Sequence, residues 1–118
     1  MGAYMRQVGN EALRKCGYNW RLYGRSIIHT YFGPVDFEVD SAGNPPTRDN
    51  KKMLAGSEEK HRLGMYLLHH GIHSQQGRMF ILSMAHTRED VDSTITALVK
   101  AIGEAMAEGA IGELPGGV

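Results

Sequence analysis

The stretch Leu82-Ser83-Met84-Ala85-His86-Thr87-Arg88-Glu89-Asp90-Val91-Asp92 decides how this chain folds, because it joins a predicted strand to the longest predicted helix. The large apolar residues at 79–84 are typical of a strand of five or six residues. Thr87 is a favourable helix N-cap, and Asp90 follows at the position where a capping box usually has Glu or Gln. The acidic residues of this first turn favour the positive end of the helix dipole. The stretch therefore predicts a strand, a compact turn and a helix start.

Apolar residues at helical spacing predict the helices. The stripe of the helix after Thr87 consists of Val91, Ile95, Leu98, Ile102, Ala105 and Met106. Gly109 suits the end of this helix. Upstream, a helix over residues 4–16 has its stripe on Met5, Val8, Ala12 and Cys16. A further helix, with Ser57 as N-cap and Gly71 at its end, has its stripe on Leu63, Tyr66, Leu67 and His70.

Aromatic and β-branched residues predict two extended segments, at 20–23 and 26–32. Gly24 and Arg25 stand between them, so a two-residue hairpin and a single bulged strand are both compatible with the sequence. Both faces of the second segment are fairly apolar, which favours a central strand or one covered on both sides. Residues 33–50, with several Pro and Gly, predict an exposed loop, and residues 110–118 predict a frayed tail.

The 118 residues predict a single domain, 1–118, long enough to bury a core without a disulfide or a metal ion. The order of elements indicates an α+β fold, a two-layer sandwich in which about three helices pack on a small, mostly antiparallel sheet. Thirteen basic residues balance thirteen acidic ones. This balance disfavours nucleic acid or an anionic membrane as a partner, and it removes self-repulsion between copies.

Cys16 is the single cysteine of the chain, so no internal disulfide forms. This usage fits a reducing compartment, and we expect a cytoplasmic protein. No apolar run approaches the length of a membrane span. We expect Cys16 to be a small buried residue near a helix end.

Two groups of residues match a known pattern. The first is Leu68-x-x-Gly71-Ile72 with Arg78-Met79-Phe80-Ile81-Leu82-Ser83-x-Ala85-His86-Thr87-x-Glu89-Asp90-Val91-Asp92-x-Thr94. The second is Gly24-x-Ser26-Ile27 followed by His29-x-Tyr31-Phe32. Together they resemble the C-terminal small domain of class III aminotransferases, which are fold-type-I enzymes that use pyridoxal phosphate (PLP), and above all the glutamate-1-semialdehyde aminomutase-like branch. The resemblance covers roughly residues 5–108.

In that family, a large domain provides the lysine that binds PLP, the aspartate beside its pyridine nitrogen and most of the phosphate-binding groups. The resemblance therefore implies that this chain has no catalytic and no cofactor-binding residue of its own. None of its lysines matches the cofactor lysine of the family: Lys15, Lys51, Lys52, Lys60 and Lys100. Arg78 falls on the strand that faces the substrate side of the family's cleft, where semialdehyde aminomutases tend to have an acidic residue. Arg78 is thus a candidate contact for a substrate carboxylate, only with a partner domain in place, and the alternative is a solvated arginine at a strand end.

The resemblance implies a stand-alone or truncated small domain, related to PLP-dependent aminotransferases and aminomutases, that does not catalyse alone. Two alternatives stay open: one part of a split aminotransferase, and a free-standing binding or oligomerisation module. A small domain without its large partner exposes an apolar face, so we expect a homo-oligomer or a large-domain partner.

The histidines allow a third hypothesis, a small metal-dependent enzyme. The candidates are His61, His69, His70, His73 and His86. A zinc site needs three or four convergent ligands, whereas Gly71 separates His69 from His73 and neighbouring histidines point in different directions. A histidine near a helix end interacts with the helix dipole, and one in a turn ties a strand to a helix. We therefore expect no metal site.

Overall fold

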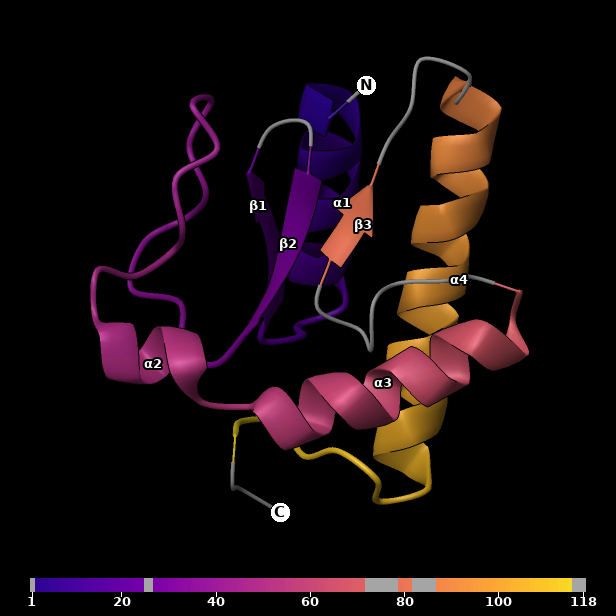
Figure 1. Ribbon diagram of the computed structural model, residues 1–118. Coiled ribbons are helices and arrows are strands. Elements are labelled where there is room, and N and C mark those ends of the chain that lie inside the picture. The colour runs from indigo at the N-terminus through magenta and orange to yellow at the C-terminus, as the bar shows by residue number, and fades with distance from the viewer. Residues whose placement is uncertain (1, 25–26, 72–78, 82–86, 116–118) are drawn as a thin grey trace.

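The computed structural model describes residues 2–24, 27–71, 79–81 and 87–115. Its elements are α1 (Gly2–Lys15), β1 (Trp20–Gly24), β2 (Ile27–Phe32), α2 (Asn50–Leu54), α3 (Ser57–His69), β3 (Met79–Ile81) and α4 (Arg88–Ala107). The strands form an antiparallel sheet in the order β1-β2-β3. Figure 1 shows α1 behind this sheet, α4 along one side and α3 across its lower end. The predicted α+β architecture, helices packed on a small antiparallel sheet, is confirmed.

The strand pairing resolves the alternatives that the sequence left open. β1 and β2 pair antiparallel, with Trp20 opposite Phe32 and Tyr23 opposite His29, so the two extended segments form a hairpin. β2 lies between β1 and β3, which confirms that it is the central strand. The strand expected at 79–84 is present at Met79–Ile81, and its remaining positions lie outside the described residues.

The ends of α4 are formed as the sequence predicts. Thr87 Oγ1 accepts a hydrogen bond from the Asp90 backbone N–H at 3.2 Å, and Asp90 Oδ2 accepts from the Thr87 N–H at 3.0 Å. An aspartate thus completes the capping box in place of Glu or Gln. At the other end, Gly109 has φ 76° and the Ala110 N–H donates to the Ala105 carbonyl at 2.9 Å. This six-to-one bond is that of a Schellman motif.

The expected N-cap at Ser57 is wrong. α3 begins at Ser57 itself, and the N-cap position is Gly56, whose φ of 81° is left-handed. The Ser57 hydroxyl donates instead to the Leu54 carbonyl at 3.0 Å. The short helix α2, which the sequence did not predict, ends three residues earlier at Leu54, and the left-handed turn at Gly56 leads directly from it into α3. α2 has its own cap, since the Asp49 side chain accepts from the Lys51 N–H at 2.9 Å.

The hydrophobic core joins α1, β1, β2, α3 and α4. Its fully buried large side chains include Met5, Leu13, Trp20, Leu22, Ile28, Phe32, Leu63, Leu67, Leu98 and Ile102. The rings of Trp20 and Phe32 stack, with centroids 4.4 Å apart. Ile111, in the segment expected to be a frayed tail, is only 3% exposed and belongs to this core. Residues 116–118 lie outside the described part.

The core face of α1 differs from the predicted stripe. Met5, Gly9 and Leu13 are buried, whereas Cys16 is exposed, so the expectation of a buried cysteine is wrong. Cys16 follows the last residue of α1, where the chain turns away from the core. A Cβ atom added at Gly9 would lie 2.5 Å from Leu22 Cδ1, which shows how closely α1 approaches β1. None of the described helices is long and apolar enough to cross a membrane.

Candidate functional site

The sheet has an outer face, opposite the helical core, because side chains alternate across its strands. On β1 and β2, the outer face consists of Arg21, Tyr23, Ile27, His29 and Tyr31. No labelled helix lies in front of β1 and β2 in the view of Figure 1.

Part of this face is accessible. Ile27 is 43% exposed, and the rings of Tyr23 and His29 stack with centroids 5.2 Å apart. Partial burial raises the pKa of the Tyr23 hydroxyl above its ordinary value, so Tyr23 is neutral at physiological pH. We call Tyr23, Ile27 and His29 the open part of the outer face. It presents an aromatic ring, an imidazole and an aliphatic group, which suit contact with another protein surface or a ligand.

The rest of the outer face is covered by the loop at 33–49. Arg21, only 6% exposed, donates from Nε to Glu38 Oε1 at 2.9 Å and from Nη2 to Glu38 Oε2 at 3.3 Å. These hydrogen bonds hold the pKa of the Glu38 carboxyl below its usual value. The Tyr31 hydroxyl donates to the Pro34 carbonyl at 2.5 Å. Burial, together with the charges of Asp36 and Asp49, raises the pKa of Tyr31 to about 12.

Two polar residues of α1 fix the free edge of β1. The Asn10 amide donates to the Leu22 carbonyl at 2.8 Å and accepts from the Leu22 N–H at 2.7 Å. Arg6 donates to the Gly24 carbonyl at 2.5 Å and to the Ser41 carbonyl at 2.8 Å, so it joins the strand end to the loop. An edge strand has unpaired backbone groups that attract other chains, and these contacts satisfy them within the domain.

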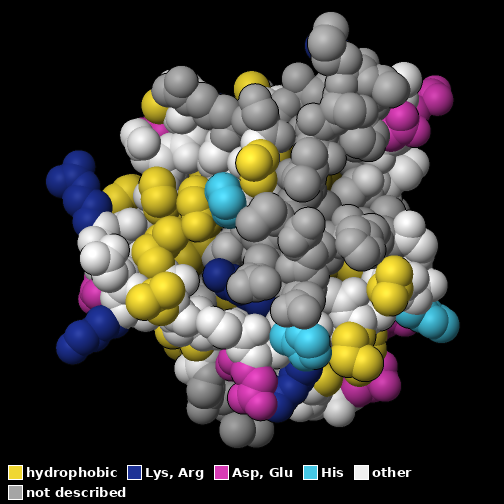
Figure 2. Space-filling view, viewed as in Figure 1, with side chains coloured by type: hydrophobic (Ala, Val, Ile, Leu, Met, Phe, Trp, Pro, Cys, Tyr) yellow, Lys and Arg dark blue, Asp and Glu magenta, His cyan; other side chains and the backbone are white. Residues whose placement is uncertain are grey.

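The loop continues into α2 through an ion pair. Lys52 Nζ donates to both carboxylate oxygens of Asp36, at 2.8 and 3.0 Å, and the Thr47 hydroxyl donates to the same carboxylate at 2.5 Å. These hydrogen bonds lower the pKa of the Asp36 carboxyl, and the bond from Lys52 has a larger effect than the bond from Thr47. Phe37 remains 44% exposed, with the Arg48 guanidinium 5.9 Å from its ring centroid. In Figure 2, hydrophobic side chains gather at the left of this view, with basic side chains beside them. A fixed loop therefore borders the open part of the outer face.

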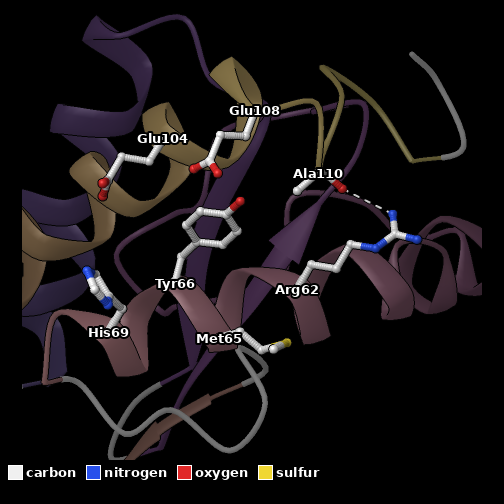
Figure 3. A pocket seen from close by; sticks show the side chains of 7 residues that line it. All are labelled: Arg62, Met65, Tyr66, His69, Glu104, Glu108 and Ala110. Atoms are coloured by element: carbon white, nitrogen blue, oxygen red, sulfur yellow. Dashed lines mark hydrogen bonds between the residues drawn. The ribbon is translucent and has the colours of Figure 1, made fainter.

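A second candidate site is a hollow of about 530 Å³ between α3 and the end of α4. Its lining residues are Arg62, Met65, Tyr66, His69, Glu104, Glu108 and Ala110. Figure 3 shows the Tyr66 ring between the two helices, with Glu108 near its hydroxyl and Glu104 toward His69. Arg62 extends away from both glutamates, and its Nη1 donates to the Ala110 carbonyl at 3.0 Å. We call this site the α3–α4 pocket.

The charges in the α3–α4 pocket are mostly negative. Burial, together with the charges of Glu108 and Glu104, raises the pKa of the Tyr66 hydroxyl. His70, the C-cap residue of α3, contacts Glu104 through Nε2 and is charged only when protonated. Arg62 is engaged elsewhere, because its Nη2 lies 3.2 Å from Glu58 Oε1.

The structure brings together only some of the residues that the sequence singled out. Arg78, His73 and His86 lie outside the described residues, so their predicted roles stay predictions. His69 and His70 lie at the end of α3 as expected, with their rings edge to face and centroids 5.7 Å apart. Within the described ranges, no group of three or more His, Cys, Asp or Glu side chains is arranged to hold a metal ion.

Sequence reasoning missed Asn10, Glu38 and the glutamates of the α3–α4 pocket. Glu104 and Glu108 had a readable signal, since acidic residues one turn apart at the C-terminal end of a helix oppose its dipole. Asn10 had a weaker signal, a poor helix former in a helix interior. Nothing local to Arg21 indicates that Glu38, 17 residues away, is its partner.

Comparison with known proteins shows a fold relationship alone. No family model matches this chain, and no curated protein matches it. A solved structure described as a transaminase with PLP bound is similar, with a TM-score of 0.66 and 22% sequence identity. The similarity covers 93% of this chain but 23% of the transaminase chain. The fold is therefore that of one part of a transaminase, and this chain spans about a quarter of the length of the protein it matches.

Proposed function

We propose that this domain forms one wall of the catalytic cleft of a PLP-dependent aminotransferase-type enzyme, opposite a large domain that holds the coenzyme. The observation that supports the proposal is the match to a PLP-bound transaminase over 93% of this chain and 23% of that one. The large domain either continues the same polypeptide or comes from another chain. The motif around residues 78–94 favours the class III aminotransferases, and within them the glutamate-1-semialdehyde aminomutase-like branch.

The open part of the outer face is the surface that we assign to the large domain. Tyr23, Ile27 and His29 are accessible there, and the loop at 33–49 is fixed beside them. Arg78 directly precedes Met79, whose backbone pairs with His29 in the sheet. We therefore keep Arg78 as the candidate contact for a substrate carboxylate once a large domain closes the cleft.

PLP, held by the large domain, supplies an electron sink for the substrate amine. The task of this chain is to exclude water and orient the substrate, because a cleft needs two walls. No lysine of the chain matches the family's cofactor lysine, so we propose that the chain alone does not transaminate. We place the enzyme in the cytoplasm, in line with the single cysteine, Cys16.

A free-standing binding or oligomerisation module is the second candidate function. It is favoured by three apolar residues on α2 and α3 whose side chains are more than half exposed. Leu54 is 75%, Met65 64% and Leu68 61% exposed. Exposed apolar groups of this kind often mark contact surfaces.

Complementation in trans tests the first proposal. The chain is mixed with a class III aminotransferase large domain from which the native small domain has been removed, and PLP absorbance and half-transamination of amino donors are measured. We expect activity only from the mixture, and weaker activity with Tyr23→Ala than with the control Gln7→Ala on the exposed face of α1.

Two results would overturn the proposal. One is a borohydride-stable PLP adduct at a single lysine of the isolated chain, together with turnover by that chain. The other is a failure of the chain to associate with any such large domain, combined with a stable self-association that Leu68→Ser abolishes. The second result would establish the binding module instead.

A further inference from the structure

We infer that the α3–α4 pocket binds a small organic cation, an ammonium group attached to an apolar body. The pocket is independent of the open part of the outer face, because its walls come from α3, the end of α4 and Ala110. Its volume of about 530 Å³ lies within the range that small ligands occupy in proteins.

The charge of the pocket selects for a cation. Glu104 and Glu108 are one turn apart, at the end of α4 where the helix dipole is negative. The last turn of α4 contains no basic residue. Within the described part of the chain, Glu108 has no ion pair and accepts a hydrogen bond from the Tyr66 hydroxyl, whereas the ion-pair partner of Glu104 is His70, an imidazole.

Among the described lining residues, Arg62 is the one permanent cation, and it does not neutralise these carboxylates. Arg62 donates to the Ala110 carbonyl and pairs with Glu58, and Figure 3 shows its side chain extended away from the glutamates. Glu108, a carboxylate beside the hollow that forms no ion pair with the described residues, repels anions and attracts an ammonium group.

The remaining walls fit an apolar body. The Tyr66 ring stands between the helices, where an ammonium group gains cation–π attraction and an aromatic group gains stacking. Met65 is 64% exposed, and its flexible thioether adapts to ligands of different shape. The described residues offer no set of three His, Cys, Asp or Glu ligands for a metal ion. An aralkylamine satisfies both the charge and the apolar surface.

The test is a titration of the isotope-labelled chain with benzylammonium at pH 8 and low salt, followed by NMR chemical shifts. We expect saturable shifts confined to α3 and the end of α4. Glu108→Gln should weaken binding about tenfold, as expected for loss of one charge-assisted contact. The matched control Glu89→Gln removes a glutamate at the opposite end of α4 and should bind like the native chain.

A second comparison needs no variant. Benzyl alcohol has the same ring without the charge and should not saturate the pocket, and raising the salt concentration should weaken benzylammonium binding. The inference is refuted if benzyl alcohol binds as tightly as benzylammonium. It is also refuted if Glu108→Gln binds benzylammonium with native affinity, or if no shifts appear at α3 and α4. Because the isolated chain is used, the result does not depend on the presence of a large domain.

Discussion

Asn10 provides the sharpest test of how this domain is held together. It lies on α1, is 9% exposed, and uses its amide to satisfy both backbone groups of Leu22 on the edge of β1. Asn10→Ala removes both contacts and leaves a buried N–H and a buried C=O unpaired. Alanine at this position adds no group that could replace them.

The expected loss of stability follows from the two backbone groups of Leu22 that lose their hydrogen-bond partner. Each buried backbone group left unsatisfied costs about 1–3 kcal/mol. Alanine returns roughly 0.5 kcal/mol, because it is a better helix former than asparagine. The expected net loss is about 1.5–5.5 kcal/mol, a large share of the roughly 5–15 kcal/mol that stabilises a domain of this size.

The assay is urea unfolding followed by circular dichroism, with Gln7→Ala as the control on the exposed face of the same helix. The control should change the free energy of unfolding by less than about 0.5 kcal/mol. A second variant, Asn10→Asp, tests the direction of the two hydrogen bonds. Its carboxylate accepts from the Leu22 N–H, but the side chain donates to the Leu22 carbonyl only when the carboxyl group is protonated. Its destabilisation should therefore be largest at neutral pH and smaller in acid.

An Asn10→Ala variant within about 0.5 kcal/mol of the native chain would contradict the reasoning. It would mean that water replaces the amide at the strand edge. An Asn10→Asp variant whose stability relative to the native chain does not change with pH would contradict the assigned direction of the two hydrogen bonds.

Three further outcomes follow from the contacts. The hydrogen bonds from Arg21 lower the pKa of Glu38. The ion pair therefore stabilises the fold fully at pH values above the usual glutamate pKa, and this stabilisation is lost as the pH falls through the lowered pKa. Hydrogen exchange of the loop at 33–49 should accelerate in acid, and Glu38→Gln should remove that part of the pH dependence. Gly9→Val places atoms into the space of Leu22 and should cost about 1–3 kcal/mol in urea unfolding, whereas native stability would show that α1 can move away. Thr87→Ala opens the capping box and should cost about 1 kcal/mol, measured as a lower thermal midpoint; an unchanged midpoint would mean that Asp90 alone satisfies the helix start.

Local signals accounted for most of the fold. The N-cap of α4 at Thr87 and the glycines after α1, α3 and α4 act within a few residues of themselves, so their effect is visible in the sequence. The apolar stripe of α4 is also local, because one face of a long helix is buried whatever it packs against. Ser57 failed as a predicted cap because α2, only five residues long, has too few positions to show a periodic pattern.

Periodicity failed on α1, where the core face includes Gly9 and Asn10. An apolar pattern detects burial by hydrophobicity, whereas Gly9 is buried because β1 approaches closely and Asn10 because a strand edge needs hydrogen bonds. Both reasons lie on another element. The candidate sites were equally hard to predict from the sequence, since the α3–α4 pocket is formed between two helices that are far apart along the chain.

By itself, the sequence determined the class of the fold, the ends of its longest helix, the hairpin segments and the resemblance to an aminotransferase small domain. These depend on backbone preferences and periodic burial, which act over short distances along the chain. Only the tertiary structure decided that the loop at 33–49 is tied to the sheet through Arg6 and Arg21, and that Glu104 and Glu108 face Tyr66 across a hollow. Those arrangements depend on contacts between residues far apart in the chain, and their energies come from burial and charge pairing that no local pattern records.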